Sequence, residues 1–144
     1  MAHILIIDDQ DTIRLTLSSC LQLLGHEVRT AADGEEGLNL FAEDPADLVI
    51  TDVQMPKKDG FAVLSTLRRE HPEVPVIVMS GVREESCSRF LDLISRYKST
   101  HVTVLRKPFS LLEVEHAVEA ALPARLPSWI NPEGLRRMFA TQLA

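Results

Sequence analysis

The sequence predicts an α/β fold with a doubly wound, five-stranded parallel sheet of the (βα)5 type. Two observations carry this prediction. Short apolar runs of strand length alternate five times with segments whose apolar residues recur at helical spacing. The connections between these segments are short, as in sheets whose strands alternate with helices. A chain of 144 residues is also long enough to bury one core.

The first part of the chain contains two of the strand–helix pairs. Strands are expected over His3–Ile7 and Glu27–Ala31. Asp11 is the predicted N-cap of the helix between them, and Gly25 is its predicted C-terminal stop. Asp33 is the predicted N-cap of the second helix. Both helices have apolar residues at helical spacing, at Ile13, Leu17, Leu21, Leu24, Leu38 and Phe41.

Three further pairs complete the predicted sheet. Leu48–Ile50 is a continuous apolar run that leads to Asp52, which favours a strand buried on both faces. Val76–Met79 and Val102–Leu105 are the other two strands. Three helices are predicted after these strands: one that begins at about Gly60, one over Arg83–Tyr97 and one over Ser110–Ala121. In the first and last of them the apolar positions are Phe61, Leu64, Leu67, Leu111, Val114, Val118 and Leu122.

The composition changes after Leu122, so we divide the chain into a sheet domain over 1–122 and an extension over 123–144. The extension begins as a proline-containing connector, with prolines at 123, 127 and 132. Asn131 is a plausible N-cap for a short amphipathic helix, with Pro132 at its first position. The apolar stripe of that helix is Leu135, Met138, Phe139 and Leu143.

Composition limits the classes of function. A hydrophobic content of 45% and a charged content of 25% are typical of a soluble globular protein. The net charge of -6 argues against direct nucleic-acid binding. No apolar run is long enough to span a bilayer, and the amino terminus enters a strand without a signal peptide. Cys20 and Cys87 lack metal-ligand spacing and are interpreted as reduced thiols of a cytoplasmic protein.

Polar side chains stand where four of the predicted strands end: Asp8 and Asp9, Asp52, Ser80, and Lys107. The carboxyl ends of parallel strands form the ligand crevice of such sheets, so these side chains are expected to meet. Three carboxylates would repel one another unless a hard divalent cation neutralised them, and Mg²⁺ prefers carboxylate, water and phosphate oxygens. The cluster therefore favours phosphoryl transfer to an aspartate nucleophile, with Lys107 and Ser80 as donors to the phosphoryl oxygens.

These residues resemble the receiver domain of response regulators in two-component signalling, whose fold is flavodoxin-like (CheY-like). The resemblance covers residues 3–122 and rests on I-L-I-I-D-D at 4–9, D-V-Q-M-P-K-K-D-G at 52–60, V-I-V-M-S-G at 76–81 and K-P-F at 107–109. It implies that Asp52 is the phosphoacceptor. It also implies that Asp9 binds Mg²⁺ directly and Asp8 indirectly.

The resemblance assigns three more roles. Gln54 would offer its backbone carbonyl to the metal, Ser80 matches the switch hydroxyl, and Lys107 matches the lysine that contacts the phosphoryl group. In that family a histidine kinase or phosphotransfer protein is the donor, and the receiver catalyses only its own phosphorylation and hydrolysis. The output would be a changed contact with an unknown downstream protein, near the fourth helix and fifth strand.

The sequence departs from the family pattern at several positions. Val104 replaces the aromatic residue that is usually coupled to the switch hydroxyl, and 96–100 replaces the usual Gly-Ala-rich turn. The last helix carries Glu113, Glu115 and Glu119 and lacks the basic pattern of regulators that dimerise through that face. The sequence leaves open whether the extension forms a homodimer contact. It also leaves open whether the 144 residues are a fragment of a longer regulator.

Two other function classes compete. One is a pseudo-receiver, an interaction module that keeps the fold without phosphorylation, although such modules typically lose the acidic pair or the acceptor. The other is a phosphatase resembling the haloacid dehalogenase group, because Asp9–Ile13 loosely matches a D-x-D-x-T motif. That interpretation leaves Asp52 without a role.

Overall fold

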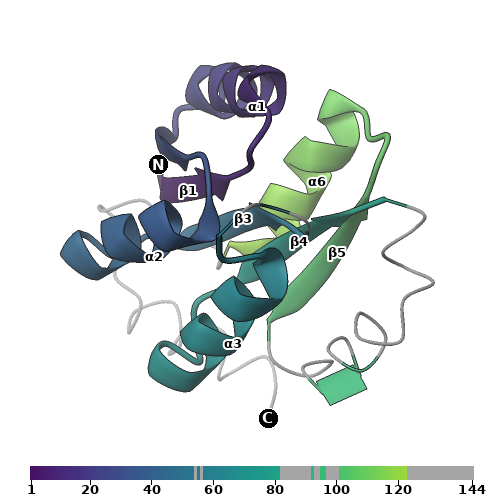
Figure 1. Ribbon diagram of the computed structural model, residues 1–144. Helices are drawn as coiled ribbons and strands as arrows, with labels where there is room; N and C mark the ends of the chain where they lie inside the picture. The colour runs from purple at the N-terminus through teal and green to yellow at the C-terminus, as the bar shows by residue number, and fades with distance from the viewer. Residues whose placement is uncertain (54, 56, 82–91, 93–94, 97–100, 123–144) are drawn as a thin grey trace, which may run out of the picture.

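Five parallel strands form one sheet (Figure 1). The computed structural model describes residues 1–53, 55, 57–81, 92, 95–96 and 101–122. The strands are β1 (His3–Ile7), β2 (Glu27–Ala31), β3 (Leu48–Asp52), β4 (Val76–Ser80) and β5 (Val102–Arg106). Their order, β2-β1-β3-β4-β5, is the flavodoxin-like order of a doubly wound sheet. The predicted fold class is therefore confirmed.

Four helices of the described chain cover the two faces of the sheet: α1 (Asp11–Leu23), α2 (Gly34–Glu43), α3 (Gly60–Glu70) and α6 (Leu111–Ala121). In Figure 1, α1 and α6 lie on one side of the sheet, and α2 and α3 lie on the other. Strands β1, β2, β3 and β5 are each followed by one of these helices, because parallel strands need crossover connections. The helices therefore bury both faces of the sheet.

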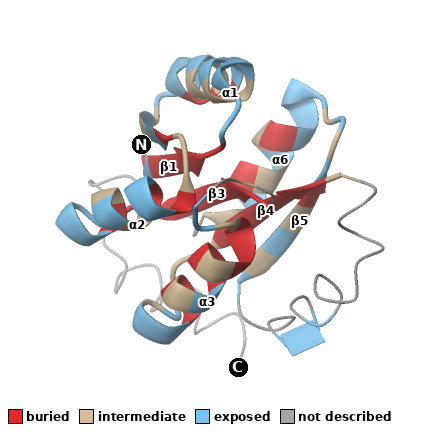
Figure 2. Cartoon of the chain, viewed as in Figure 1, coloured by how far each residue is buried: buried red, intermediate tan, exposed pale blue. Residues whose placement is uncertain are grey.

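Two apolar layers hold the sheet, and the alternation of side chains along each strand separates them. In β1, for example, Leu5 and Ile7 pack in the layer with α2 and α3, whereas Ile4 and Ile6 pack in the layer with α1 and α6. β3 and β4 are buried along their whole length (Figure 2). Continuous apolar runs such as Leu48–Ile50 follow from burial on both faces.

The helix ends agree with most of the predicted capping residues. Gly25 has φ +91°, and the N–H groups of Gly25 and His26 donate to carbonyls of the last turn of α1. This is a Schellman C-cap, in which glycine accepts the left-handed conformation. Asp33 caps α2 by accepting the N–H of Glu36. Ser110 caps α6 in the same way, at the N–H of Glu113.

Three sequence-based predictions within the described helices are wrong. Asp11 is the first helical residue of α1, and the N-cap is Gln10, whose side chain makes no capping hydrogen bond. Asp11 instead pairs with Arg14 one turn further on. Leu24 lies beyond the last turn of α1 and is 42% exposed, and Leu111, in the first turn of α6, is 50% exposed. These helix ends extend past the apolar layer that covers Val114 and Val118.

Three predictions fall partly or wholly outside the described residues. Of the predicted helix over 83–97, Asp92, Ser95 and Arg96 are described and are helical. The extension over 123–144 and Cys87 lie wholly outside them. Cys20 is a free, half-buried thiol, as predicted. Within the described helices, none is long and apolar enough to cross a membrane.

Candidate functional site

The sheet brings the predicted site residues to its carboxyl edge. Asp8 follows β1, Asp52 ends β3, Ser80 ends β4, and Lys107 follows β5. Because these strands are parallel neighbours, their carboxyl ends lie along one edge. Register pairs Asp52 with Met79, one residue before Ser80, so the ends of β3 and β4 are level.

Lys107 lies between the two buried carboxylates. Its Nζ is 3.1 Å from Asp52 Oδ1 and 3.7 Å from Asp8 Oδ2. Asp8 is fully buried, and Asp52 is 5% exposed. The second oxygen of Asp8, Oδ1, accepts the N–H of Gln10 at 2.8 Å, and Asp52 Oδ1 also accepts the N–H of Val53 at 2.9 Å. These contacts orient both carboxylates toward the ammonium group of Lys107.

Burial makes both acids reluctant to ionise. Desolvation raises the pKa of Asp52 to about 6, and the nearby negative charge of Asp8 adds to the rise. Lys107 and the N–H of Val53 act against it. The pKa of Asp8 is also raised, chiefly by desolvation, while the N–H of Gln10 and the charge of Lys107 lower it. One lysine thus leaves the pair of acids undercompensated.

Asp9 completes a group that fits a hard cation. Asp8, Asp9 and Asp52 each offer a carboxylate oxygen, and these oxygens lie within 4.8 Å of one another. Asp9 is exposed, so the group opens to solvent on that side. Buried Asp8 Oδ2 has no hydrogen-bond partner within the described part of the chain. An orphaned, buried carboxylate oxygen in an all-oxygen group matches the ligand preference of Mg²⁺, so the residues fit the predicted metal.

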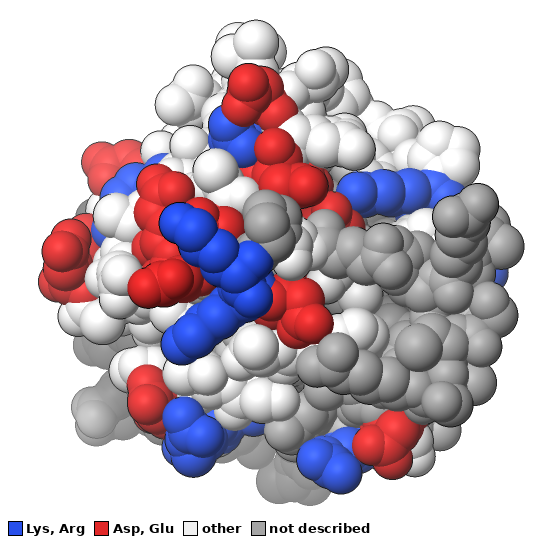
Figure 3. Space-filling model, in the orientation of Figure 1, with Lys and Arg blue, Asp and Glu red and all other residues white. Residues whose placement is uncertain are grey.

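The acidic character of this region extends over the surface. Figure 3 shows Asp and Glu side chains gathered on the upper left of the face, in the region of α1 and α2, with Lys and Arg side chains among them. The first helix does not use Asp9 as its cap, because Gln10 holds that position. Capping of α1 therefore does not account for Asp9.

The other predicted site residues are less completely defined. Ser80 is fully buried, and its carbonyl accepts the N–H of Lys107 at 2.7 Å, which ties the end of β4 to the lysine. Gln54 lies outside the described residues. Val104 pairs with Val78 and is partly buried against the layer beneath α2 and α3, so a small side chain fills the position that is usually aromatic in the family that the sequence resembles.

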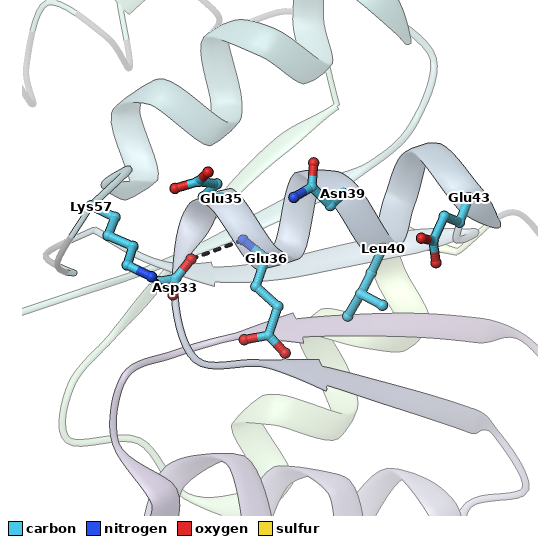
Figure 4. Close-up of a pocket in the computed structure, with 7 residues that line it drawn as sticks. All are labelled: Asp33, Glu35, Glu36, Asn39, Leu40, Glu43 and Lys57. Atoms are coloured by element: carbon cyan, nitrogen blue, oxygen red, sulfur yellow. Dashed lines mark hydrogen bonds and ion pairs between the residues drawn. The ribbon is translucent and has the colours of Figure 1, made fainter.

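The loop after β3 is anchored to the start of α2, a contact that was not predicted. The N–H of Gly34 donates to the carbonyl of Lys58 at 3.1 Å, and Lys57 Nζ lies 3.6 Å from Asp33 Oδ2. Figure 4 shows Lys57 reaching toward Asp33 at one end of an acidic hollow of about 310 Å³ over α2. Lys57 has φ +64°, a conformation that such contacts help to hold. Residues 24 positions apart give no sequence signal for this contact.

Comparisons with known proteins agree with this geometry. Residues 4–119 match the family model described as the response regulator receiver domain. The chain is 37% identical over 120 residues to the probable transcriptional regulator ycf27 of Cyanidium caldarium. The aligned region covers 83% of this chain and 46% of that protein. The chain is also 34% identical over 123 residues to the sensor kinase CckA of Brucella abortus. That aligned region covers 84% of this chain and 12% of the kinase.

A solved structure shares the fold. The crystal structure of a response regulator receiver domain protein from Clostridium thermocellum superimposes with a TM-score of 0.73 at 33% identity, over 84% of this chain and 94% of that one. The chain spans about half the length of the transcriptional regulator that it resembles, and a much smaller part of the kinase. The similarity therefore concerns the domain, and the activities of the longer proteins are not part of it.

Proposed function

The chain belongs to the response regulator receiver family of two-component signalling, and from this premise we propose that Asp52 is its phosphoacceptor. The observation that carries the proposal is the ion pair between buried Asp52 and Lys107 at the carboxyl edge of the sheet. A carboxylate in that position is oriented toward a cation and lies beside solvent-open Asp9. The phosphatase alternative gives Asp52 no role, so this geometry favours the receiver.

The reaction would be transfer of a phosphoryl group from a phosphohistidine. An oxygen of the Asp52 carboxylate attacks phosphorus, the new O–P bond forms as the N–P bond breaks, and the imidazole leaves with the electron pair of that bond. Lys107 stands 3.1 Å from the attacking carboxylate, where its ammonium would neutralise charge on the phosphoryl oxygens. Ser80, at the end of the neighbouring strand, would supply a hydroxyl donor.

The three acids would hold Mg²⁺. Asp9 and Asp52 would bind it directly and Asp8 indirectly, with Gln54 contributing its backbone carbonyl as the resemblance implies. When bound, the cation would neutralise the carboxylates and the phosphoryl oxygens. The protein's own part would be to keep Asp8 and Asp52 fixed by backbone N–H groups, so that little reorganisation is needed at the moment of transfer.

The proposed output is a changed protein contact. The donor would be a histidine kinase or phosphotransfer protein, and the target a downstream protein of unidentified class. The backbone N–H of Lys107 donates a hydrogen bond to the carbonyl of Ser80. A movement of Lys107 toward a phosphoryl group would therefore act on the ends of β4 and β5. Since Val104 is small, we propose that this backbone link carries the signal in place of an aromatic side chain.

The test is the intact mass of the protein after incubation with a small-molecule phosphodonor, with and without Mg²⁺. We expect a Mg²⁺-dependent gain of one phosphoryl group in the wild type and none in Asp52→Asn. Asp47→Asn is a matched control, because Asp47 caps the N–H of His3 at the opposite edge of the sheet. That variant should gain the phosphoryl group as the wild type does.

A folded protein that gains no mass under any condition would contradict the proposal and leave the pseudo-receiver interpretation ahead. Modification that persists in Asp52→Asn would place the acceptor elsewhere. Turnover of a generic phosphate ester that is lost in Asp9→Asn but kept in Asp52→Asn would favour the phosphatase.

A further inference from the structure

Arg14, in the second turn of α1, is tied to the acidic pair. We propose that it is a positioning residue that holds the Asp8–Asp9 peptide in the conformation that binds the cation. Its Nη1 donates to the Asp8 carbonyl at 2.7 Å, and its Nη2 pairs with Asp11. This inference rests on the proposed function, because it concerns the same metal site.

The contact fixes the one part of the loop that carries both acids. The Asp8 carbonyl belongs to the planar peptide unit that joins Asp8 to Asp9, so holding it also fixes the backbone of Asp9. Two other groups of Asp8 are also engaged: its N–H donates to the Ala31 carbonyl, and its Oδ1 accepts the N–H of Gln10. Arg14 supplies the remaining backbone tie, from a side chain that is only 18% exposed.

Without that tie, Asp9 would be the least restrained of the three acids. It is exposed, and the cap of α1 at Gln10 has no side-chain hydrogen bond that would stiffen the turn. A cation that draws on Asp9 and Asp52 needs their oxygens close together before it binds. Residues that orient metal ligands typically change metal affinity by about 10- to 100-fold when they are replaced.

The charge of Arg14 gives this proposal a diagnostic sign. A guanidinium that is hydrogen-bonded to the Asp8 carbonyl repels a cation that approaches the acidic pair, so a purely electrostatic role predicts that neutralising Arg14 tightens Mg²⁺ binding. A positioning role predicts the reverse. Arg14→Gln should therefore bind Mg²⁺ more weakly, even though the site has gained net negative charge.

The experiment is calorimetric titration of Mg²⁺ into the unphosphorylated full chain. We expect Arg14→Gln to raise the Kd by about tenfold. Arg14→Lys keeps the charge but lacks the planar fork of donors, so it should also raise the Kd. Phosphorylation by the small-molecule donor should need more Mg²⁺ for half-maximal rate in both variants, while the rate at saturating Mg²⁺ stays close to that of the wild type.

Arg29→Gln is the matched control. Arg29 also donates from its guanidinium to two backbone carbonyls, those of Leu40 and Asp44, but at the far end of α2. Its loss should lower the free energy of unfolding without changing Mg²⁺ affinity. Urea unfolding of all variants separates stability from binding, and Arg14→Lys keeps the test open if Arg14→Gln fails to fold.

Unchanged or tighter Mg²⁺ binding by folded Arg14→Gln would overturn the inference, and so would an equal weakening in Arg29→Gln. Neither result would affect the assignment of Asp52, which the mass experiment tests separately. A wild type that gains the phosphoryl group but binds no Mg²⁺ would overturn both the cation site and this inference.

Discussion

The cost of ionising Asp52 gives the sharpest prediction: Asp52→Asn should stabilise the protein at neutral pH when Mg²⁺ is absent. Asparagine has nearly the shape of the protonated acid and carries no charge. The wild type must instead keep a carboxylate in a site that is 5% exposed and lies beside Asp8. Removing the charge of the proposed phosphoacceptor should therefore raise the free energy of unfolding, which is the opposite of what most core substitutions do.

The magnitude follows from the pKa. The pKa of Asp52 rises from an ordinary value of 3.8 to about 6 in the folded protein. That difference corresponds to about 3 kcal/mol of unfolding free energy once the acid is ionised in both states. Because the folded pKa is the higher one, the stability linked to Asp52 is fully present below 3.8 and is lost as the pH rises through about 6.

The assay is urea unfolding of wild type and Asp52→Asn between pH 4 and 8, with a chelator present. We expect the two to have similar stability near pH 4 and to diverge by up to about 3 kcal/mol above pH 7. Saturating Mg²⁺ should close the gap by stabilising only the protein that binds it. A variant that is less stable than the wild type at pH 7.5, or a gap that does not depend on pH, would refute this account of the site.

Two further predictions concern contacts away from the carboxylates. Gly34→Ala should destabilise the protein by about 1–3 kcal/mol and slow phosphorylation, because a Cβ there overlaps the Lys58 carbonyl; helix propensity alone would predict a gain of about 1 kcal/mol, so the sign in urea unfolding decides. Arg68→Ala should cost about 2 kcal/mol or more, since buried Arg68 donates to carbonyls over 71–74. Its Mg²⁺-dependent phosphorylation should be unchanged, which the mass assay checks against the stability loss.

The fold could be predicted because the strand signals were local and independent. Continuous apolar runs such as Leu48–Ile50 favour a strand buried on both faces, and the parallel strands all end at the same edge of the sheet. The shared edge also predicted that Asp8, Asp52 and Lys107 lie close together. In the structure a carboxylate oxygen of each aspartate lies within 3.7 Å of Lys107 Nζ. Topology therefore carried the prediction of the site's position as well as that of the fold.

What could not be predicted depends on the third dimension. Asp11 has the composition of an N-cap, but Arg14 draws its carboxylate onto the first turn, and the helix begins one residue earlier than the capping rule suggested. Leu111 has the right spacing for the apolar face but lies beyond the end of the layer it would join. The contact between Gly34 and Lys58 joins two loops that only the folded sheet brings together.

These features together give a reason for the proposed acceptor, Asp52, to lie at a buried strand end and not on the surface. At a surface carboxylate, water and salt would screen much of each change of charge. At buried Asp52 a change of charge is screened less. Ionisation of Asp52 lowers the stability of the fold, because the site is desolvated and the charge of Asp8 opposes ionisation. The lysine that compensates is bonded to the backbone of Ser80. A phosphoryl group on Asp52 would add negative charge that Lys107 and a bound cation would help to offset, so under the proposed function the end of β5 would respond to the state of the site.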